Sequence, residues 1–172
     1  MRGEINKILT ERLQLIFEWY KGIIDEETGR FVYIYHSQYS HLLFDHTKNG
    51  ELKKAIKDYV FELQDRIIQG HFYKNVEKYP RQQSSVEVAC ALEGLNDPYS
   101  LAYHENDDRT DTYYDCICGA LSYLLEVQCI HHCAEKQRGG FGFLLTDRIQ
   151  RIDVTGHVVS AFIKSLKNKI VC

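Results

Sequence analysis

The chain has 172 residues, of which 44% are hydrophobic and 26% are charged. These values are close to those of soluble globular proteins, and they exclude a disordered, collagen-like or membrane-embedded chain. The 21 Lys and Arg against 24 Asp and Glu give a net charge of −3, so no global field attracts a polyanion and we expect no nucleic acid partner. The length suits one domain over residues 1–172.

The N-terminus and the cysteines predict the compartment. Polar and charged residues occupy the first positions, where a signal peptide needs an apolar run, and no stretch approaches about 18 apolar residues, so we expect no membrane anchor. The six cysteines are too sparse for a disulfide scaffold, and we interpret them as reduced thiols. Together these features predict a cytoplasmic location, with export by a route that the N-terminus does not show as the alternative.

The N-terminal half contains two strong helical patterns. Apolar residues at i, i+3 and i+4 spacing predict a helix over 4–23. A turn and a short aromatic β-like segment at 31–35 follow, and then a brief helix near 38–46. A second long helix is expected over 51–68, ending at Gly70.

The C-terminal half begins with a capping signature. Ser84 as N-cap and Glu87 three residues later form a capping box that opens a helix at 85. Pro98 is expected to restart or kink this helix, because proline lacks the backbone N–H that a helix interior needs. Further helices are expected over 112–132 and 152–167, separated by a glycine-rich turn at 138–143.

This organisation is repetitive. The helices 4–23, 51–68 and 112–132 are each followed by a glycine and an aromatic residue, and then by another helix; the three turns are Gly29-Arg30-Phe31, Gly70-His71-Phe72 and Gly140-Phe141. A helix that ends in the left-handed region favours glycine, which predicts a positive φ at Gly70 and Gly140. The pattern indicates an all-α fold built from helical hairpins.

The segment 88–128 carries a resemblance. Its runs Ala91-Leu92-Glu93-Gly94-Leu95 and 121–128, followed by Gly139-Gly140-Phe141, resemble an inner and outer helix pair of the (α/α) toroid enzymes. That group includes six-hairpin glycosidases, N-acylglucosamine 2-epimerase-like enzymes, and prenyltransferase and terpene-cyclase toroids. The resemblance covers most of the chain as a repeat pattern and implies a partial toroid, about half of a closed ring. An ordinary helical bundle is the alternative.

A ring of hairpins would gather the N-termini of its inner helices at one mouth, where helix dipoles favour anionic groups and loop side chains converge. Carboxylates and imidazoles there suit acid–base chemistry on a polyhydroxylated substrate. The candidate catalytic residues are Glu87, Asp153 and His157, and the candidate substrate-binding residues are Tyr33, Tyr35, His36, Arg81, Gln83 and Arg151.

Asp153 and His157 lie at i and i+4, so the carboxylate is expected to orient the imidazole. A simple surface or capping pair is the alternative there, and Glu87 has a sufficient role in its capping box.

The resemblance to the toroid enzymes, together with these candidate residues, implies a sugar-acting hydrolase or epimerase that needs no cofactor.

Two other functions stay open. In the first, the chain is a non-catalytic helical interaction module that binds a protein partner. In the second, it is a zinc-dependent prenyltransferase-like toroid, because Thr112-Tyr113-Tyr114-Asp115-Cys116 resembles the zinc-binding neighbourhood of protein prenyltransferase β subunits. That run lacks a histidine at the corresponding place, and the spacing of Cys129, His131, His132 and Cys133 matches no zinc motif, so no metal is expected.

The partial ring also predicts self-association. Its first and last hairpins would leave apolar flanks without a neighbour in the same chain, and uncovered apolar patches usually mark interfaces. A two-fold pairing is the commonest closed solution, so we expect a homodimer or a place in a larger assembly. The flanking residues are Ile5, Leu9, Leu13 and Ile16 at one end and Val158, Phe162, Ile163 and Leu166 at the other.

Overall fold

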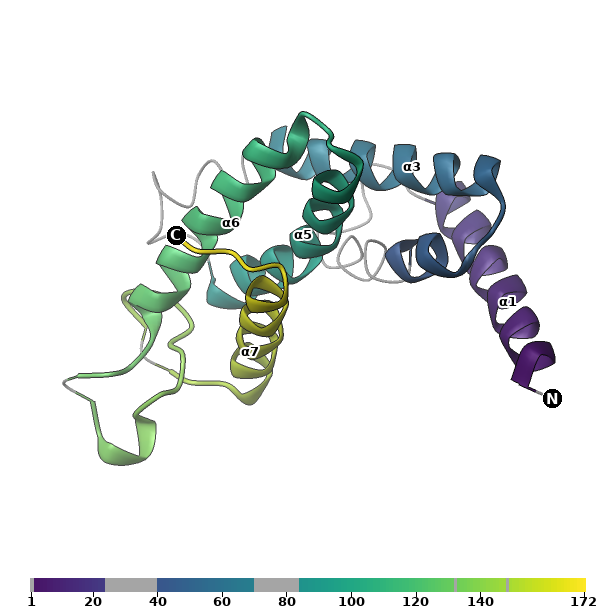
Figure 1. Ribbon diagram of the computed structural model, residues 1–172. Helices are drawn as coiled ribbons and strands as arrows, with labels where there is room; N and C mark the ends of the chain where they lie inside the picture. The colour runs from purple at the N-terminus through teal and green to yellow at the C-terminus, as the bar shows by residue number, and fades with distance from the viewer. Residues whose placement is uncertain (1, 24–39, 70–83, 132, 148) are drawn as a thin grey trace.

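The computed structural model describes residues 2–23, 40–69, 84–131, 133–147 and 149–172 (Figure 1). The predicted aromatic segment at 31–35, the turn at Phe72 and Gly70 itself lie outside the described residues. Within the described ranges the chain forms helices and two isolated β-bridges, which confirms the all-α prediction. No helix in these ranges is long and apolar enough to cross a membrane.

The helices follow the predicted order, and residues 40–46 form the brief helix that was expected there. The other elements are α1 (Arg2–Ile23), α3 (Gly50–Gln69), α5 (Ser85–Glu105), α6 (Arg109–Val127), the 3-10 turn η2 (Glu135–Gln137) and α7 (Ile152–Lys167). The bounds of α7 are those that the sequence predicts. Pro98 lies inside α5, which continues through it, so the predicted restart of the helix does not occur.

The end of α6 differs from the prediction of residue 132. The helix stops at Val127 because the following backbone pairs with the glycine-rich turn instead of with the preceding carbonyls. Cys129 N donates to Gly140 O at 2.8 Å, and Gly142 N donates to Val127 O at 3.1 Å. The result is an isolated β-bridge that pairs Gln128, directly after α6, with Phe141 in the segment that leads into α7.

The glycines of this turn also differ from the prediction. Gly139 has the positive φ, at 89°, and Gly140 does not, so the prediction for Gly140 is wrong. Gly140 instead allows a close approach, because a Cβ there would lie 2.4 Å from Gln150 Oε1. The left-handed residue therefore belongs to the loop between η2 and the pairing, well past the end of α6.

We call residues 84–172 the body. In the body, α5 and α6 are antiparallel neighbours joined by a tight turn in which Asn106 has φ 52°. Helix α7 runs parallel to α5, since successive contacts advance along both helices in the same direction, from His157 with Glu93 to Lys164 with Asp97 (Figure 1). All three helices bury apolar side chains in one core, which includes Leu92, Leu95, Ile117, Leu124, Val154 and Val158.

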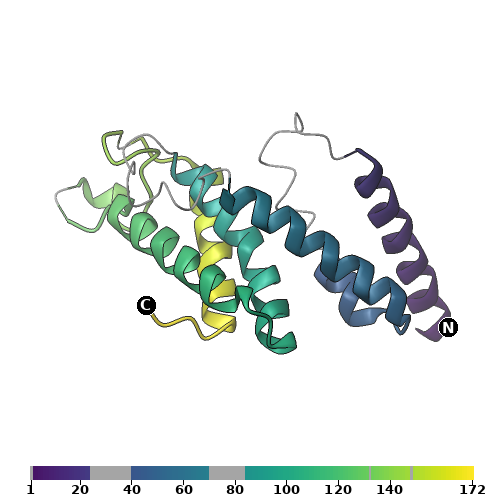
Figure 2. The same ribbon diagram turned by 90° about the horizontal axis from the view of Figure 1, so that it is seen from above.

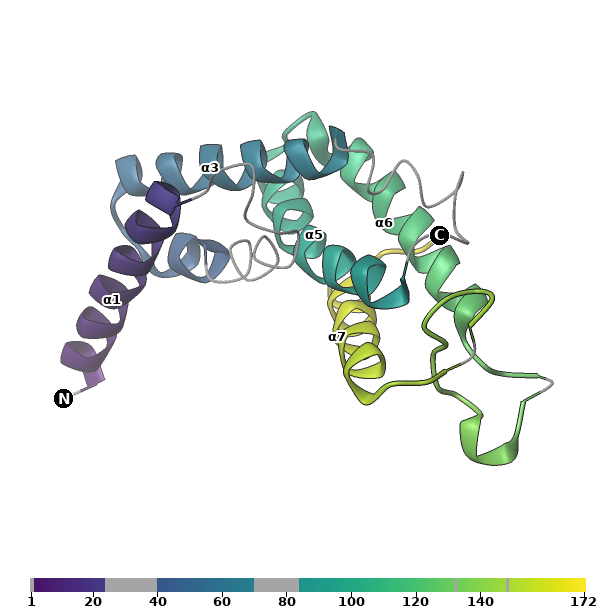
Figure 3. The ribbon, with the colours of Figure 1, turned by 180° about the vertical axis from the view of Figure 1, so that it is seen from behind.

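We call residues 2–23 and 40–69 the arm. Its core is a separate cluster made by Phe17, Leu43, Leu52, Ile56 and Val60. Helix α3 runs from this cluster to the body, as Figures 2 and 3 show, and places Phe61 and Ile68 in the core of the body. Helix α1 projects away from the body in both views.

Polar contacts join the arm to the body at the far end of α3. Tyr113 Oη donates to Asp65 Oδ1 at 2.9 Å, and Arg109 Nε donates to Asp65 Oδ2, also at 2.9 Å. The Arg109 guanidinium lies over the Phe61 ring, 4.9 Å from its centroid. Burial, together with the hydrogen bond to Asp65, raises the pKa of Tyr113, so this hydroxyl stays protonated as a donor.

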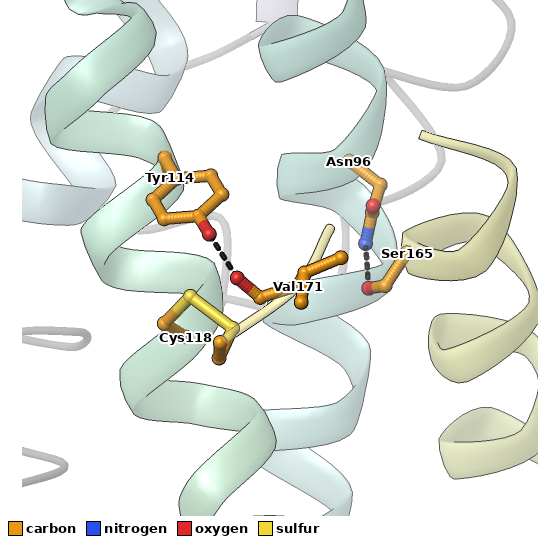
Figure 4. Close-up of a disulfide and its surroundings, with 6 residues drawn as sticks. Asn96, Tyr114, Cys118, Ser165 and Val171 are labelled. Carbon is orange, nitrogen blue, oxygen red and sulfur yellow. Dashed lines mark hydrogen bonds between the residues drawn. A yellow bond between two sulfur atoms is a disulfide. The ribbon is translucent and has the colours of Figure 1, made fainter. Parts of the chain in front are cut away.

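Four cysteines form disulfides, so the interpretation of all six as reduced thiols is wrong. Cys118 pairs with Cys172, and Cys129 pairs with Cys133, whereas Cys90 and Cys116 belong to neither disulfide. The first disulfide ties the C-terminal residues to α6 (Figure 4), where the Tyr114 hydroxyl also donates to the carbonyl of Val171. Cysteine spacing could not reveal this pairing, because it joins residues that are 54 positions apart.

Candidate functional site

The N-terminal ends of α5 and α7 meet at a hollow of about 600 Å³, which we call the α5/α7 hollow. Four of the predicted site residues, Glu87, Arg151, Asp153 and His157, line it together with Ser84, Val86, Phe143 and Leu144. The other five, Tyr33, Tyr35, His36, Arg81 and Gln83, lie outside the described residues. The hollow therefore has two helix starts and the loop between α6 and α7 as its walls.

The first turn of α5 forms one wall, and the capping box that the sequence predicts is present. Ser84 Oγ accepts from Glu87 N at 3.3 Å, while the Glu87 carboxylate accepts from both the backbone N and the Oγ of Ser84, at 3.3 and 2.8 Å. Ser85 N donates to Phe143 O at 2.8 Å, and Ser85 Oγ donates to Gly142 O at 2.7 Å. These bonds fix the helix start against the loop and hold the Glu87 carboxylate at the rim.

A bidentate ion pair at the start of α7 forms another part of the lining. Arg151, directly before α7, donates to Asp153 through Nε at 3.0 Å and through a terminal nitrogen at 2.6 Å. The Arg151 guanidinium also lies 5.7 Å from the centroid of Phe143. Hydrogen bonds from Arg151, and then from backbone N–H groups at the helix start, hold the pKa of Asp153 below its usual value. Asp153 is therefore an ionised hydrogen-bond acceptor at neutral pH.

The imidazole of His157 is held by a different carboxylate from the one predicted. Its Nδ1 lies 3.0 Å from Glu93 Oε2, and Ser160 Oγ donates to Glu93 Oε1 at 2.6 Å. The expectation that Asp153 orients His157 is therefore wrong, because Asp153 bonds to Arg151 instead. The side chain of Glu93 is 13% exposed, so the contact with His157 is largely shielded from water.

Sequence reasoning missed Glu93 as a site residue. It was visible only as a carboxylate on a helix face that is otherwise buried, between Ala89 at i−4 and Asn96 at i+3. Buried carboxylates are almost always paired, so such a position indicates a partner elsewhere in the chain. The partner lies on a helix 64 residues later and could not be identified from spacing.

A second carboxylate–histidine pair lies one turn further along α5. Asp97 accepts from Lys164 Nζ at 2.6 Å, and its other oxygen lies 3.2 Å from His41 Nδ1. The hydrogen bond to Asp97 raises the pKa of His41, with smaller contributions from the charges of Asp97 and Asp45, while burial and Lys164 oppose the shift. This pair joins the arm to the body and does not line the α5/α7 hollow.

The Cys90 thiol, on the same helix as Glu87 and Glu93, is not a nucleophile. Cys90 is buried, and desolvation, reinforced by the charges of Glu93, Asp153 and Glu87, raises its pKa to about 12. The thiolate, which is the reactive form, is therefore absent at neutral pH. In the part of the chain that the structure describes, no three His, Cys, Asp or Glu side chains gather as a metal-binding group.

The α5/α7 hollow thus combines an oriented imidazole, two carboxylates and a guanidinium with an apolar wall made by Val86, Phe143 and Leu144. An imidazole can act as a general acid or base, and the other charged groups can bind hydroxyls. No protein-family model, curated protein or solved structure matches the chain. The geometry of the α5/α7 hollow is therefore the basis for proposing a function.

Proposed function

We propose that the α5/α7 hollow binds a sugar or another polyhydroxylated ligand and carries acid–base chemistry on it, of the hydrolase or epimerase type. The observation that carries the proposal is the convergence of Glu87, Asp153 and His157 on one hollow from two separate helices. Groups that accept and donate hydrogen bonds around an apolar wall are what a sugar ring with its hydroxyls requires.

Each group would have a distinct role. His157 would transfer the proton, since imidazole is the side chain most often used for this near neutral pH. The ionised Asp153 and its partner Arg151 would bind ligand hydroxyls as acceptor and donor, and Glu87, at the start of α5, would accept from a further hydroxyl. Phe143 would lie against the apolar face of the ring.

The arrangement of the body supports the partial toroid as its architecture. Helices α5 and α7 are parallel and adjacent, as inner helices of a toroid would be, and α6 packs antiparallel to α5, as an outer helix would. In such a ring the inner N-termini share one mouth, and the α5/α7 hollow lies where two of them meet.

Ligand-observed NMR with a panel of neutral and acidic sugars tests the proposal. We expect at least one sugar to bind the wild-type chain and the control Lys167→Gln, an exposed position of α7 outside the hollow. We expect His157→Gln to lose turnover of that sugar, followed as new anomeric or epimeric signals. Arg151→Gln, with an unchanged circular dichroism spectrum, should weaken binding about tenfold, the loss of one charge-assisted hydrogen bond. A panel without any binder, or equal binding and turnover in all four proteins, would contradict the proposal.

A second candidate function, an interaction module that forms a homodimer, is favoured by a different observation. Three residues at seven-residue intervals, Ile152, Val159 and Leu166, are 93%, 46% and 73% exposed along one face of α7, with Ile163 beside them at 47%. A seven-residue apolar repeat is typical of a helix that packs on another helix.

The residues predicted to flank the ring divide between exposed and buried. Leu9, Ile16, Ile163 and Leu166 are exposed, Leu13 and Phe162 are partly buried, and Val158 is fully buried against the core. The side chain of Ile5 lies outside the described residues. The exposed members support a homodimer through α7 or α1.

Light scattering at micromolar concentration tests the dimer. We expect twice the mass of one chain for the wild type and a single chain for Ile163→Asp, because a charge would be buried without a partner. Leu125→Asp on α6 is the matched control, since Leu125 is 54% exposed and lies outside the α7 face. A wild-type monomer would remove the dimer and leave the sugar-binding proposal untouched.

A further inference from the structure

We infer that Glu93 is the positioning residue that fixes the His157 ring with its proton on Nδ1, which leaves Nε2 as the basic nitrogen for chemistry in the α5/α7 hollow. The role of Nε2 in proton transfer to a ligand rests on the proposed function. The placement of the proton is nevertheless a property of the free protein, so it can be tested without any ligand.

The chemistry of the two groups decides which of them donates the hydrogen bond. An ionised carboxylate can only accept hydrogen bonds, so the 3.0 Å contact between His157 Nδ1 and Glu93 Oε2 requires the proton to be on Nδ1. A neutral imidazole carries one ring proton, and its other nitrogen then keeps a lone pair. Nε2 of His157 is therefore the acceptor, in a residue that lines the hollow.

Both oxygens of Glu93 are held by the same helix. His157 bonds to Oε2, and Ser160, three residues later on α7, donates to Oε1 at 2.6 Å. Two residues on one turn of α7 therefore contact the two oxygens of the Glu93 carboxylate, which restricts the rotation of this carboxylate. Because the Glu93 side chain is only 13% exposed, few water molecules compete for these bonds, and they are stronger than they would be at the surface.

The Asp97–His41 pair on the next turn of α5 differs from the Glu93–His157 pair in how its carboxylate is used. Asp97 shares its carboxylate between His41 and the ammonium of Lys164, so part of its charge is already neutralised by a permanent cation. His41 belongs to the arm and contacts a second carboxylate, Asp45, at 3.9 Å. Of the two pairs, only the one with Glu93 presents a histidine to the α5/α7 hollow.

Long-range proton–nitrogen NMR of a chain labelled with ¹⁵N-histidine tests the inference, at a pH where the rings are neutral. In the wild type we expect the His157 signals of a ring protonated at Nδ1. In Glu93→Gln we expect this preference to disappear, because an amide can donate as well as accept. The matched control is Asp97→Asn, which should change the signals of His41 and leave those of His157 in place.

The wild-type spectrum alone is decisive if the Gln variant does not fold. A His157 proton on Nε2 would overturn the inference, and so would an unchanged tautomer in a folded Glu93→Gln chain. For a sugar that the protein converts, we expect Glu93→Gln to lower kcat by a factor of about 100 or more with KM changed less than about threefold, because only the proton transfer is impaired.

The two proposals fail separately. A correct tautomer with no sugar bound would leave Glu93 as the positioning residue and reject the sugar site. Sugar binding with the wrong tautomer would do the reverse.

Discussion

The body and the arm are built from similar amphipathic helices, yet they bury them to different extents. In the body, α5 is covered by both α6 and α7, so Leu92 and Leu95 are fully buried on it. In the arm, α1 inserts Phe17 into a small cluster while Leu15 and Trp19 remain 60% and 61% exposed. Helical periodicity therefore predicts a helix equally well in both regions. How much each helix stabilises the fold depends on how many other helices pack against its apolar face.

The body and the arm also differ in their relation to the candidate site. Every described residue that lines the α5/α7 hollow belongs to the body. The arm contacts the body through α3 and through polar pairs such as Asp65 with Arg109 and His41 with Asp97. We therefore expect changes in the arm to leave the hollow intact.

The largest expected effect comes from truncating each core. Leu92→Ala should destabilise the whole body by about 2–5 kcal/mol, because it leaves a cavity among fully buried side chains. Phe17→Ala also truncates a fully buried side chain but should lower protection from hydrogen exchange only in the arm. Hydrogen exchange followed by mass spectrometry measures both. Equal loss of protection across the chain in the two variants would show that the arm and the body unfold as one unit.

The next effect concerns the disulfide between Cys118 and Cys172. It closes a loop of 54 positions within the body, so its loss in Cys172→Ser should cost about 2–4 kcal/mol in chemical denaturation. Cys133→Ser opens a loop of only 4 positions and serves as the control with a smaller expected effect. Six free thiols in a chain purified without reductant would contradict both bonds and agree with the cytoplasmic location that the sequence predicts.

A smaller effect tests the contact between the arm and the body. The pKa of His41 is raised in the folded chain from its ordinary value of 6.5 by Asp97 and Asp45. A raised folded pKa stabilises the protein fully below the unfolded pKa and loses this contribution as pH rises through the folded pKa. His41→Gln should therefore cost about 1 kcal/mol at about pH 5.5 and less at about pH 9, measured by urea denaturation. The same cost at both values would contradict the ion pair with Asp97.

Local signals explain which parts of the molecule the sequence predicts. The capping box at Ser84 and the apolar repeat of 152–167 act within a few residues, and both are present as expected. The predicted end of α6 is wrong because Gln128 pairs with Phe141 across a turn, which no helical periodicity records. Tertiary contacts override local preference at such positions.

The candidate site shows the same limit. Helix starts could be located, so Glu87, Asp153 and His157 were expected near one another, and they line one hollow. Spacing within one helix predicts Asp153 as the partner of His157, and that prediction is wrong. Asp153 instead bonds to its close neighbour Arg151, and the imidazole is held by Glu93 from another helix. Spacing thus identified which residues share a region and failed to identify which of them bond.

A ligand site in the α5/α7 hollow is tested most sharply with the two histidines as reporters of the two regions. His157 lines the hollow in the body, whereas His41 lies where the arm meets the body. When a sugar from the panel is titrated into a chain labelled with ¹⁵N-histidine, we expect the ring signals of His157 to shift in a saturable way and those of His41 to remain in place. Shifts at His41 with none at His157, or no shift at either ring, would contradict a ligand site in the α5/α7 hollow.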